Sequence, residues 1–162
     1  MHGTPLQEEL EVDEMWSFVG DKGNQRWVWT VLCRRTRQVV AYAVGKRDIA
    51  TGQKLWQSVC DLPDALSRYR FARVYTDAHA MYDSIMPVTQ HWPSDEDGGQ
   101  GGTNHLERFH LTLRQRLARL TRKTLAFSKS DEMHLVHLRL FFQRYNLERK
   151  QHYLTKIHLQ HD

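Results

Sequence analysis

The chain is poor in cysteine and has no long apolar run. Its two cysteines, Cys33 and Cys60, are too few for a disulfide framework, and their spacing is not that of a zinc site. The longest apolar run, Val39 to Val44, is far too short to cross a bilayer. The first residues are acidic and lack the basic-then-apolar order of a signal peptide. We therefore expect a cytoplasmic protein with reduced thiols and no membrane partner.

Length and composition fit one soluble globular domain. The 162 residues are 40% apolar and 26% charged, which is enough to bury a core. We divide the chain into a lead-in at 1–9, a folded domain at 10–148 and a polar tail at 149–162.

The net charge of +4 is unevenly distributed. Residues 104–150 hold eleven Lys and Arg and four acids, so +7, whereas residues 1–103 hold eleven and fourteen, so −3. Such a basic stretch is typical either of a solvated, arginine-rich helical face or of a surface that binds a polyanion such as nucleic acid. Composition leaves both interpretations open.

The hydrophobic pattern changes from strand-like to helix-like along the chain. Three strands joined by short polar turns predict an antiparallel meander, and alternating helices and strands follow. This order predicts an α/β fold of the ribonuclease H-like type, with a mixed five-stranded sheet flanked by helices. The expected strands are 10–19, 26–32, 38–44, 71–76 and a weak one at 87–92; the expected helices are 51–61 (capped by Asp48 or Thr51), 78–86, 103–122 and 131–148 (capped by Ser130).

Three acids from distant parts of the sequence can meet in that fold. Asp13 lies within the first strand, Asp77 ends the fourth, and Glu107 lies on the helix 103–122. Clustered carboxylates repel one another, and two Mg²⁺ ions about 4 Å apart would offset this and act on a phosphodiester. Oxygen ligands suit Mg²⁺ or Mn²⁺ rather than zinc.

Each acid also has a simpler interpretation. Glu14 adjoins Asp13, and strand alternation does not choose between them. Asp77 can end a strand or cap a helix, and Glu107 can be an acid stabilised by the helix dipole. The basic face opposite it on this helix carries Arg116 and Arg119.

The histidines and one loop raise further possibilities. The spacings of the ten histidines do not predict a zinc site. His79 and His110 can lie near the carboxylates and contact DNA or the attacking water, or they can be ordinary histidines. The acidic, glycine-rich segment 94–102 is typical of a flexible linker rather than of a metal-binding loop.

Four segments together resemble the transposases of the insertion-sequence-one type, in the Asp-Asp-Glu transposase and integrase group. They are VDEMWSFV at 12–19, TDAHAMY at 76–82, LERFHLTLRQRLARL at 106–120 and RKTLAFSKS at 122–130. The resemblance covers about 12–147. It implies that Asp13, Asp77 and Glu107 form the catalytic triad that binds Mg²⁺, and that Arg114 is the basic residue beside it.

The resemblance implies metal-dependent cleavage of DNA and strand transfer by the freed 3′ hydroxyl. We expect DNA phosphates to be bound by Arg114, Arg116, Arg119, Arg122 and Lys123. The chain departs from the family at Ala78, where glycine is usual, and in the acidic segment 94–102. Family members also carry an N-terminal DNA-recognition region, so we expect a fused or separate one, and a multimer on DNA. The alternatives are a nuclease or resolvase on the same scaffold, or a DNA-binding remnant without catalysis.

Overall fold

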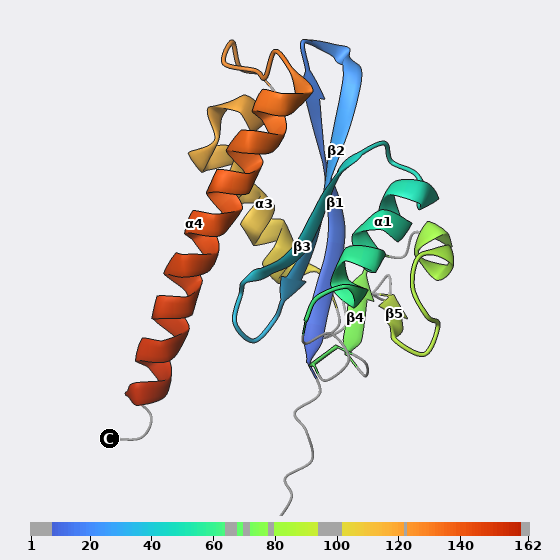
Figure 1. The fold of residues 1–162 in the computed structure, drawn as a ribbon, viewed down its shortest axis with the longest axis vertical. Coiled ribbons are helices and arrows are strands. Elements are labelled where there is room, and N and C mark those ends of the chain that lie inside the picture. The colour runs from blue at the N-terminus through green and yellow to red at the C-terminus, as the bar shows by residue number, and fades with distance from the viewer. Residues whose placement is uncertain are drawn as a thin grey trace, which may run out of the picture.

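A central mixed sheet organises the protein (Figure 1). The computed structural model describes residues 8–63, 68–69, 72–77, 80–93, 102–121 and 123–159. The strand order is β3-β2-β1-β4-β5, in which β1, β2 and β3 are antiparallel and β4 and β5 run parallel to β1. The strands are β1 (Glu9–Val19), β2 (Asp21–Cys33), β3 (Val39–Gly45), β4 (Arg73–Thr76) and β5 (His91–Pro93). The predicted five-stranded α/β fold, consistent with the ribonuclease H-like type, is confirmed.

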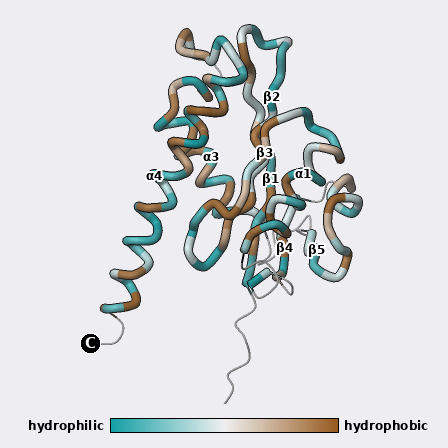
Figure 2. The backbone as a smooth tube through the Cα atoms, in the orientation of Figure 1, coloured by the Kyte–Doolittle hydropathy of each residue, from teal (hydrophilic) through white to brown (hydrophobic). Residues whose placement is uncertain are grey.

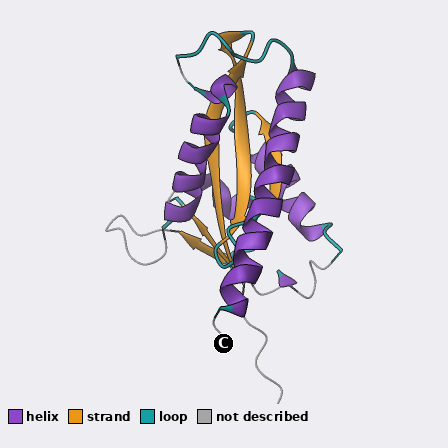
Figure 3. Cartoon of the chain, turned by 90° about the vertical axis from the view of Figure 1, so that its left-hand side faces the viewer, coloured by secondary structure: helices purple, strands orange, loops and turns teal. Residues whose placement is uncertain are grey.

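Helices cover both faces of this sheet, as the two perpendicular views show (Figures 1 and 3). One face packs against α1 (Ile49–Cys60) and the 3-10 turn η1 (Ala80–Ser84). The other packs against α3 (Asn104–Arg116), the 3-10 turn η2 (Ala118–Leu120) and α4 (Asp131–His158). Each face therefore has its own hydrophobic core.

The central strand β1 contributes to both cores, which explains its weak alternation. Leu10 and Val12 pack toward α1, whereas Met15 packs toward α3 and α4. A strand buried on both faces needs apolar residues on both faces. Polar residues in such a strand are therefore exceptions to the apolar pattern and do not indicate a solvent-exposed face. In β1 those exceptions are carboxylates.

Local signals fixed several element ends as predicted. The Asp48 side chain accepts a hydrogen bond from the Thr51 N–H at 2.8 Å and begins α1. Ser130 does the same for Met133 at the start of α4. The start of β2 differs from the prediction: the strand begins at Asp21 rather than at residue 26, because Gly20, with φ of 78°, already makes the tight turn after β1, a conformation that costs glycine little.

Two helix ends differ from the prediction. The predicted helix 103–122 ends at Arg116, because Leu117 is extended and η2 then turns Leu120 into the core, where it is 3% exposed. The last helix was expected to end near Glu148 but continues to His158. A contact outside the helix stabilises this extension, since Arg35 donates to the Tyr153 hydroxyl.

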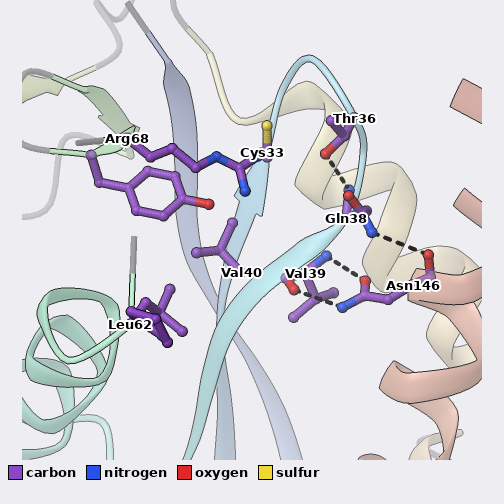
Figure 4. Close-up of a pocket in the computed structure, with 10 residues that line it drawn as sticks. Cys33, Thr36, Gln38, Val39, Val40, Leu62, Arg68 and Asn146 are labelled. Atoms are coloured by element: carbon purple, nitrogen blue, oxygen red, sulfur yellow. Dashed lines mark hydrogen bonds between the residues drawn. The ribbon is translucent and has the colours of Figure 1, made fainter. Parts of the chain in front are cut away.

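A side-chain amide attaches α4 to the edge strand β3. Asn146 accepts from the Val39 N–H at 2.7 Å and donates to the Val39 carbonyl at 2.8 Å, as a neighbouring strand would (Figure 4). Hydrophobic and hydrophilic residues alternate along α4 (Figure 2), and Leu138 and Phe142 are among those it buries. Within the described ranges, no helix is long and apolar enough to span a bilayer.

Candidate active site

Two of the predicted acids meet where the parallel strands β1 and β4 end their pairing. The last residue pair of β1 and β4 is Glu11 with Tyr75, and Asp13 and Asp77 each follow two residues later, Asp77 just beyond the end of β4. Asp13, Asp77 and Glu14 each offer an oxygen within 4.8 Å of the others. The hydrogen-bonded ladder sets this arrangement, because each residue is rigidly placed by its own strand.

Glu14 belongs to the group but is already bound by other side chains. Its carboxylate accepts from Arg47 Nε at 2.6 Å and from the Tyr82 hydroxyl. Burial raises the pKa of Glu14, and the nearby charge of Asp13 adds to this, while the hydrogen bonds from Tyr82 and Arg47 oppose it. Burial likewise raises the pKa of Tyr82. Glu14 thus has two fixed donors, whereas the Asp13 side chain is 20% exposed.

Glu107 lies near this group without being part of it. It is in the first turn of α3, is exposed, and accepts a hydrogen bond from the Thr103 hydroxyl at 3.4 Å. Helix α3 lies alongside β1, because the Leu106 N–H donates to Glu11 and His110 contacts Asp13. Glu107 is therefore about one helical turn from the residue that contacts Asp13.

His110 is the histidine that reaches the carboxylates. Its Nδ1 lies 3.4 Å from Asp13 Oδ2, and its side chain is 8% exposed. Its Nε2 is buried and has no hydrogen-bond partner among the described residues. The ring therefore packs beside the Asp13 carboxylate and limits the positions that this carboxylate can take. His79, the other predicted candidate, lies outside the described residues.

A buried ion pair joins the elements that carry all three acids, and sequence reasoning missed it. Glu11 is fully buried and accepts from Arg34 Nε at 2.8 Å, His105 Nδ1 at 2.6 Å and the Leu106 N–H at 2.7 Å. Arg34 also donates to the Gly102 carbonyl at 2.5 Å and lies 3.8 Å from the Tyr75 ring centroid. Glu11 is two residues before Asp13, Tyr75 two before Asp77, and Leu106 one before Glu107. The only sequence signal was an acid among the strand's apolar residues.

The predicted DNA-binding residues that the structure describes lie in different surroundings. Arg114 is half-buried on α3, one turn beyond His110 and so on the side of the carboxylates. Arg116 instead pairs with Glu148 of α4 at 2.9 Å. Lys123 is exposed, Arg119 is half-buried within η2, and Arg122 lies outside the described residues. Their role in DNA binding stays a prediction.

The donor set fits a hard divalent cation. Asp13, Asp77 and Glu14 supply only carboxylate oxygens, which Mg²⁺ and Mn²⁺ prefer. Carboxylates this close together repel one another unless a cation or a proton compensates. The arrangement can therefore hold a cation against a phosphate group.

The chain is similar in sequence to the transposase of insertion elements. The family model for IS1 transposase matches residues 9–153. The InsB protein of insertion element IS1 from Shigella flexneri is 39% identical over 124 residues, covering 76% of this chain and 86% of that protein. The InsB protein of element iso-IS1n from Shigella dysenteriae is 33% identical over 135 residues, covering 83% and 94%. The InsB protein of element IS1 4 from Escherichia coli (strain K12) is 38% identical, covering 76% and 67%.

Proposed function

Because this chain belongs to the IS1 transposase family, we propose that it is a catalytic domain that cleaves DNA at the ends of an insertion element and joins the freed 3′ hydroxyl to target DNA. The observation that carries this proposal is the meeting of Asp13 and Asp77 with Glu14, at the carboxyl end of β4. Carboxylates at this end of parallel strands are well placed for a substrate that lies along the sheet edge.

The proposed reaction has two phosphodiester steps. Water adds to the phosphorus at the element's end, and the 3′ oxygen leaves and takes a proton. That 3′ hydroxyl then adds to a phosphorus of target DNA and displaces a target 3′ oxygen, so that one phosphodiester replaces another. Neither step needs a covalent bond to the protein.

The chain's own residues would prepare the site for both steps. Asp13, Asp77 and Glu107 would hold two Mg²⁺ ions, which would supply activation of the attacking oxygen and stabilisation of the leaving oxygen. Arg47 and Tyr82 bind the Glu14 side chain, and the Glu14 backbone N–H donates to Asp13 Oδ1 at 2.8 Å and so helps to hold that carboxylate. His110 orients the Asp13 carboxylate. Arg114 would bind a phosphate next to the triad, and recognition of the element's ends would fall to an N-terminal region and a multimer on DNA.

A joining assay with a pre-cut element end tests this proposal without requiring end recognition. An oligonucleotide with a free 3′ hydroxyl is incubated with supercoiled plasmid and Mg²⁺ or Mn²⁺, and joined products are counted. Wild type should join the DNA, whereas the joining rate of Asp77→Asn should be at least about 100-fold lower, as expected when a charged ligand is removed from a metal site. Asp61→Asn is the matched control, because Asp61 is an exposed carboxylate at the end of α1 whose side chain accepts a hydrogen bond from Gln57.

The outcomes separate the alternatives. Plasmid cutting without joining indicates a nuclease or resolvase. DNA binding without cutting, even with the recognition region of a relative supplied, indicates a remnant. Equal joining by wild type and Asp77→Asn removes Asp77 from the mechanism. A Mn²⁺-dependent rise in the midpoint of thermal unfolding that Asp77→Asn abolishes would report the metal site independently of activity.

A further inference from the structure

A basic pocket lies on the other side of α3 from the carboxylates. It has a volume of about 460 Å³ and is bounded by the first turns of α3, by α4 and by the turn between β2 and β3. The pocket lies over β2, whereas Asp77 follows β4 on the opposite side of β1. Its polar lining is Arg37, Asn104, His105, Arg108, Thr112 and Arg149, together with the Tyr145 ring, and no lining residue is acidic.

Two of these guanidinium groups have buried N–H groups that nothing nearby accepts. Arg37 Nη1 and Arg149 Nε are inaccessible to solvent and have no hydrogen-bond partner in the described parts of the chain, so a ligand in the pocket would bind the other guanidinium nitrogens of these two arginines. Leaving such a donor unmet costs about 1–3 kcal/mol, and more when the group is charged. Arg149 is also held against Tyr145, with its guanidinium carbon 5.2 Å from the ring centroid.

The backbone holds Arg37 in place at some cost. Its φ is 62°, in the left-handed region, where glycine or asparagine would be less strained. Its N–H donates to the Cys33 carbonyl at 2.8 Å, which closes the turn. Burial lowers the pKa of Arg37; the charge of Glu11 opposes this shift, and the charge of Arg34 adds to it. The nearby acid Glu11 is already bound by Arg34, His105 and Leu106.

We propose that this pocket binds a backbone phosphate of DNA. Guanidinium N–H groups are the donors best matched to phosphate oxygens, and three arginines from three different elements line the pocket. The first turn of α3 adds the positive end of the helix dipole. Asn104 and Arg108 are exposed at its rim, so a strand can enter from solvent.

The proposed strand would also pass the active site. Arg108 directly follows Glu107 on α3 and points about 100° around the helix from it. A strand with one phosphate in the pocket would have to cross the first turns of α3 to reach Glu107. This assignment rests on DNA as the substrate of the proposed function, but it concerns binding and not cleavage.

The test measures DNA binding in EDTA, where no cleavage occurs, so the failure of catalysis does not affect it. Fluorescence anisotropy with a labelled duplex compares wild type, Arg108→Gln and Arg149→Gln at several salt concentrations. Each variant should weaken binding several-fold and lower the salt-dependence slope by about 0.9, the value for one phosphate contact. Arg139→Gln is the matched control: it lies on α4, ten residues before Arg149, is exposed, and is not part of the pocket.

A second measurement distinguishes DNA phosphate from free phosphate. Inorganic phosphate should compete with the duplex and raise the midpoint of thermal unfolding of wild type, and both effects should be lost in the Arg108→Gln/Arg149→Gln double variant. Stabilisation by phosphate without any effect of the variants on DNA binding would overturn the assignment to DNA. Equal losses in Arg139→Gln would also overturn it, because net charge alone would then explain the binding. No change in either assay would remove the pocket as a site.

Discussion

The buried carboxylate of Glu11 should make a large contribution to stability, because it binds both Arg34 and the start of α3. The perturbation is Glu11→Gln, which keeps the shape of the side chain. An amide NH2 group, which cannot accept a hydrogen bond, replaces one of the two carboxylate oxygens. Either the Leu106 N–H, or Arg34 and His105 together, then lose their acceptor.

The size of the effect follows from burial. The Glu11 side chain is 0% exposed and that of Arg34 is 13% exposed. Removing one partner of a buried ion pair costs about 3–5 kcal/mol, and we expect about 3 kcal/mol because Arg34 can partly regain water. That is a large part of the 5–15 kcal/mol typical of a whole domain, yet the fold should persist.

Urea unfolding measures this loss, and amide hydrogen exchange localises it. The Leu106 N–H donates to Glu11 at 2.7 Å in wild type. In Glu11→Gln, hydrogen exchange at the Leu106 amide should speed up relative to wild type by more than exchange at amides in the middle of α4. The control is Glu9→Gln, two residues away on the same strand and bound to Tyr75 at 3.0 Å. The Glu9 side chain is 41% exposed, so its loss should cost under about 1 kcal/mol. Equal losses in the two variants, or unchanged exchange at Leu106, would refute the reasoning.

Two further predictions concern the packing of each face. Burial lowers the pKa of His134. Below about pH 6.5 this histidine therefore takes up a proton in the unfolded chain but stays neutral in the folded protein. Its contribution to stability is complete above that pH, and the free energy of unfolding falls by up to about 1.4 kcal/mol per pH unit below it. Urea unfolding at pH 7.5 and 5.5 should show this slope in wild type and in the partly exposed control His137→Gln, but not in His134→Gln, and a persistent slope would contradict the cause. In Gly52→Ala the new Cβ would lie 2.2 Å from Ile85 Cδ1, so we expect a loss of about 1–3 kcal/mol by thermal or urea unfolding; no loss would mean that Ile85 moves freely.

Local chemistry predicted the elements, and tertiary contacts decided where two of them end. The helix caps at Asp48 and Ser130 depend on a side chain and an N–H three residues away, so the sequence contains the whole signal. The break after Arg116 has no such signal, because it serves to place Leu120 in a core shared with β1 and α4. The extension of α4 likewise depends on Arg35, 118 residues before Tyr153.

The candidate site shows the same division. That Asp13 and Asp77 meet could be predicted, because Asp13 lies on β1, Asp77 directly follows β4, and the parallel pairing of these two strands follows from the element order. The involvement of Glu14 could not be resolved, because its donors Arg47 and Tyr82 come from 33 and 68 residues further along the chain. The Glu11–Arg34 pair was missed for the same reason, since an acid in a strand reveals its partners only when the sheet forms.

These differences suggest how the site is assembled. Asp13 and Asp77 are placed by the sheet itself, so their separation should not change while β1 and β4 are paired. Glu107 is placed by a helix that contacts β1 through Glu11 at one point and through His110 at another. Its approach to the other two acids therefore depends on how α3 sits, and the Glu11–Arg34 pair controls the start of that helix. A weakened pair should consequently reduce joining by more than the loss of stability explains, at temperatures where the variant is still fully folded.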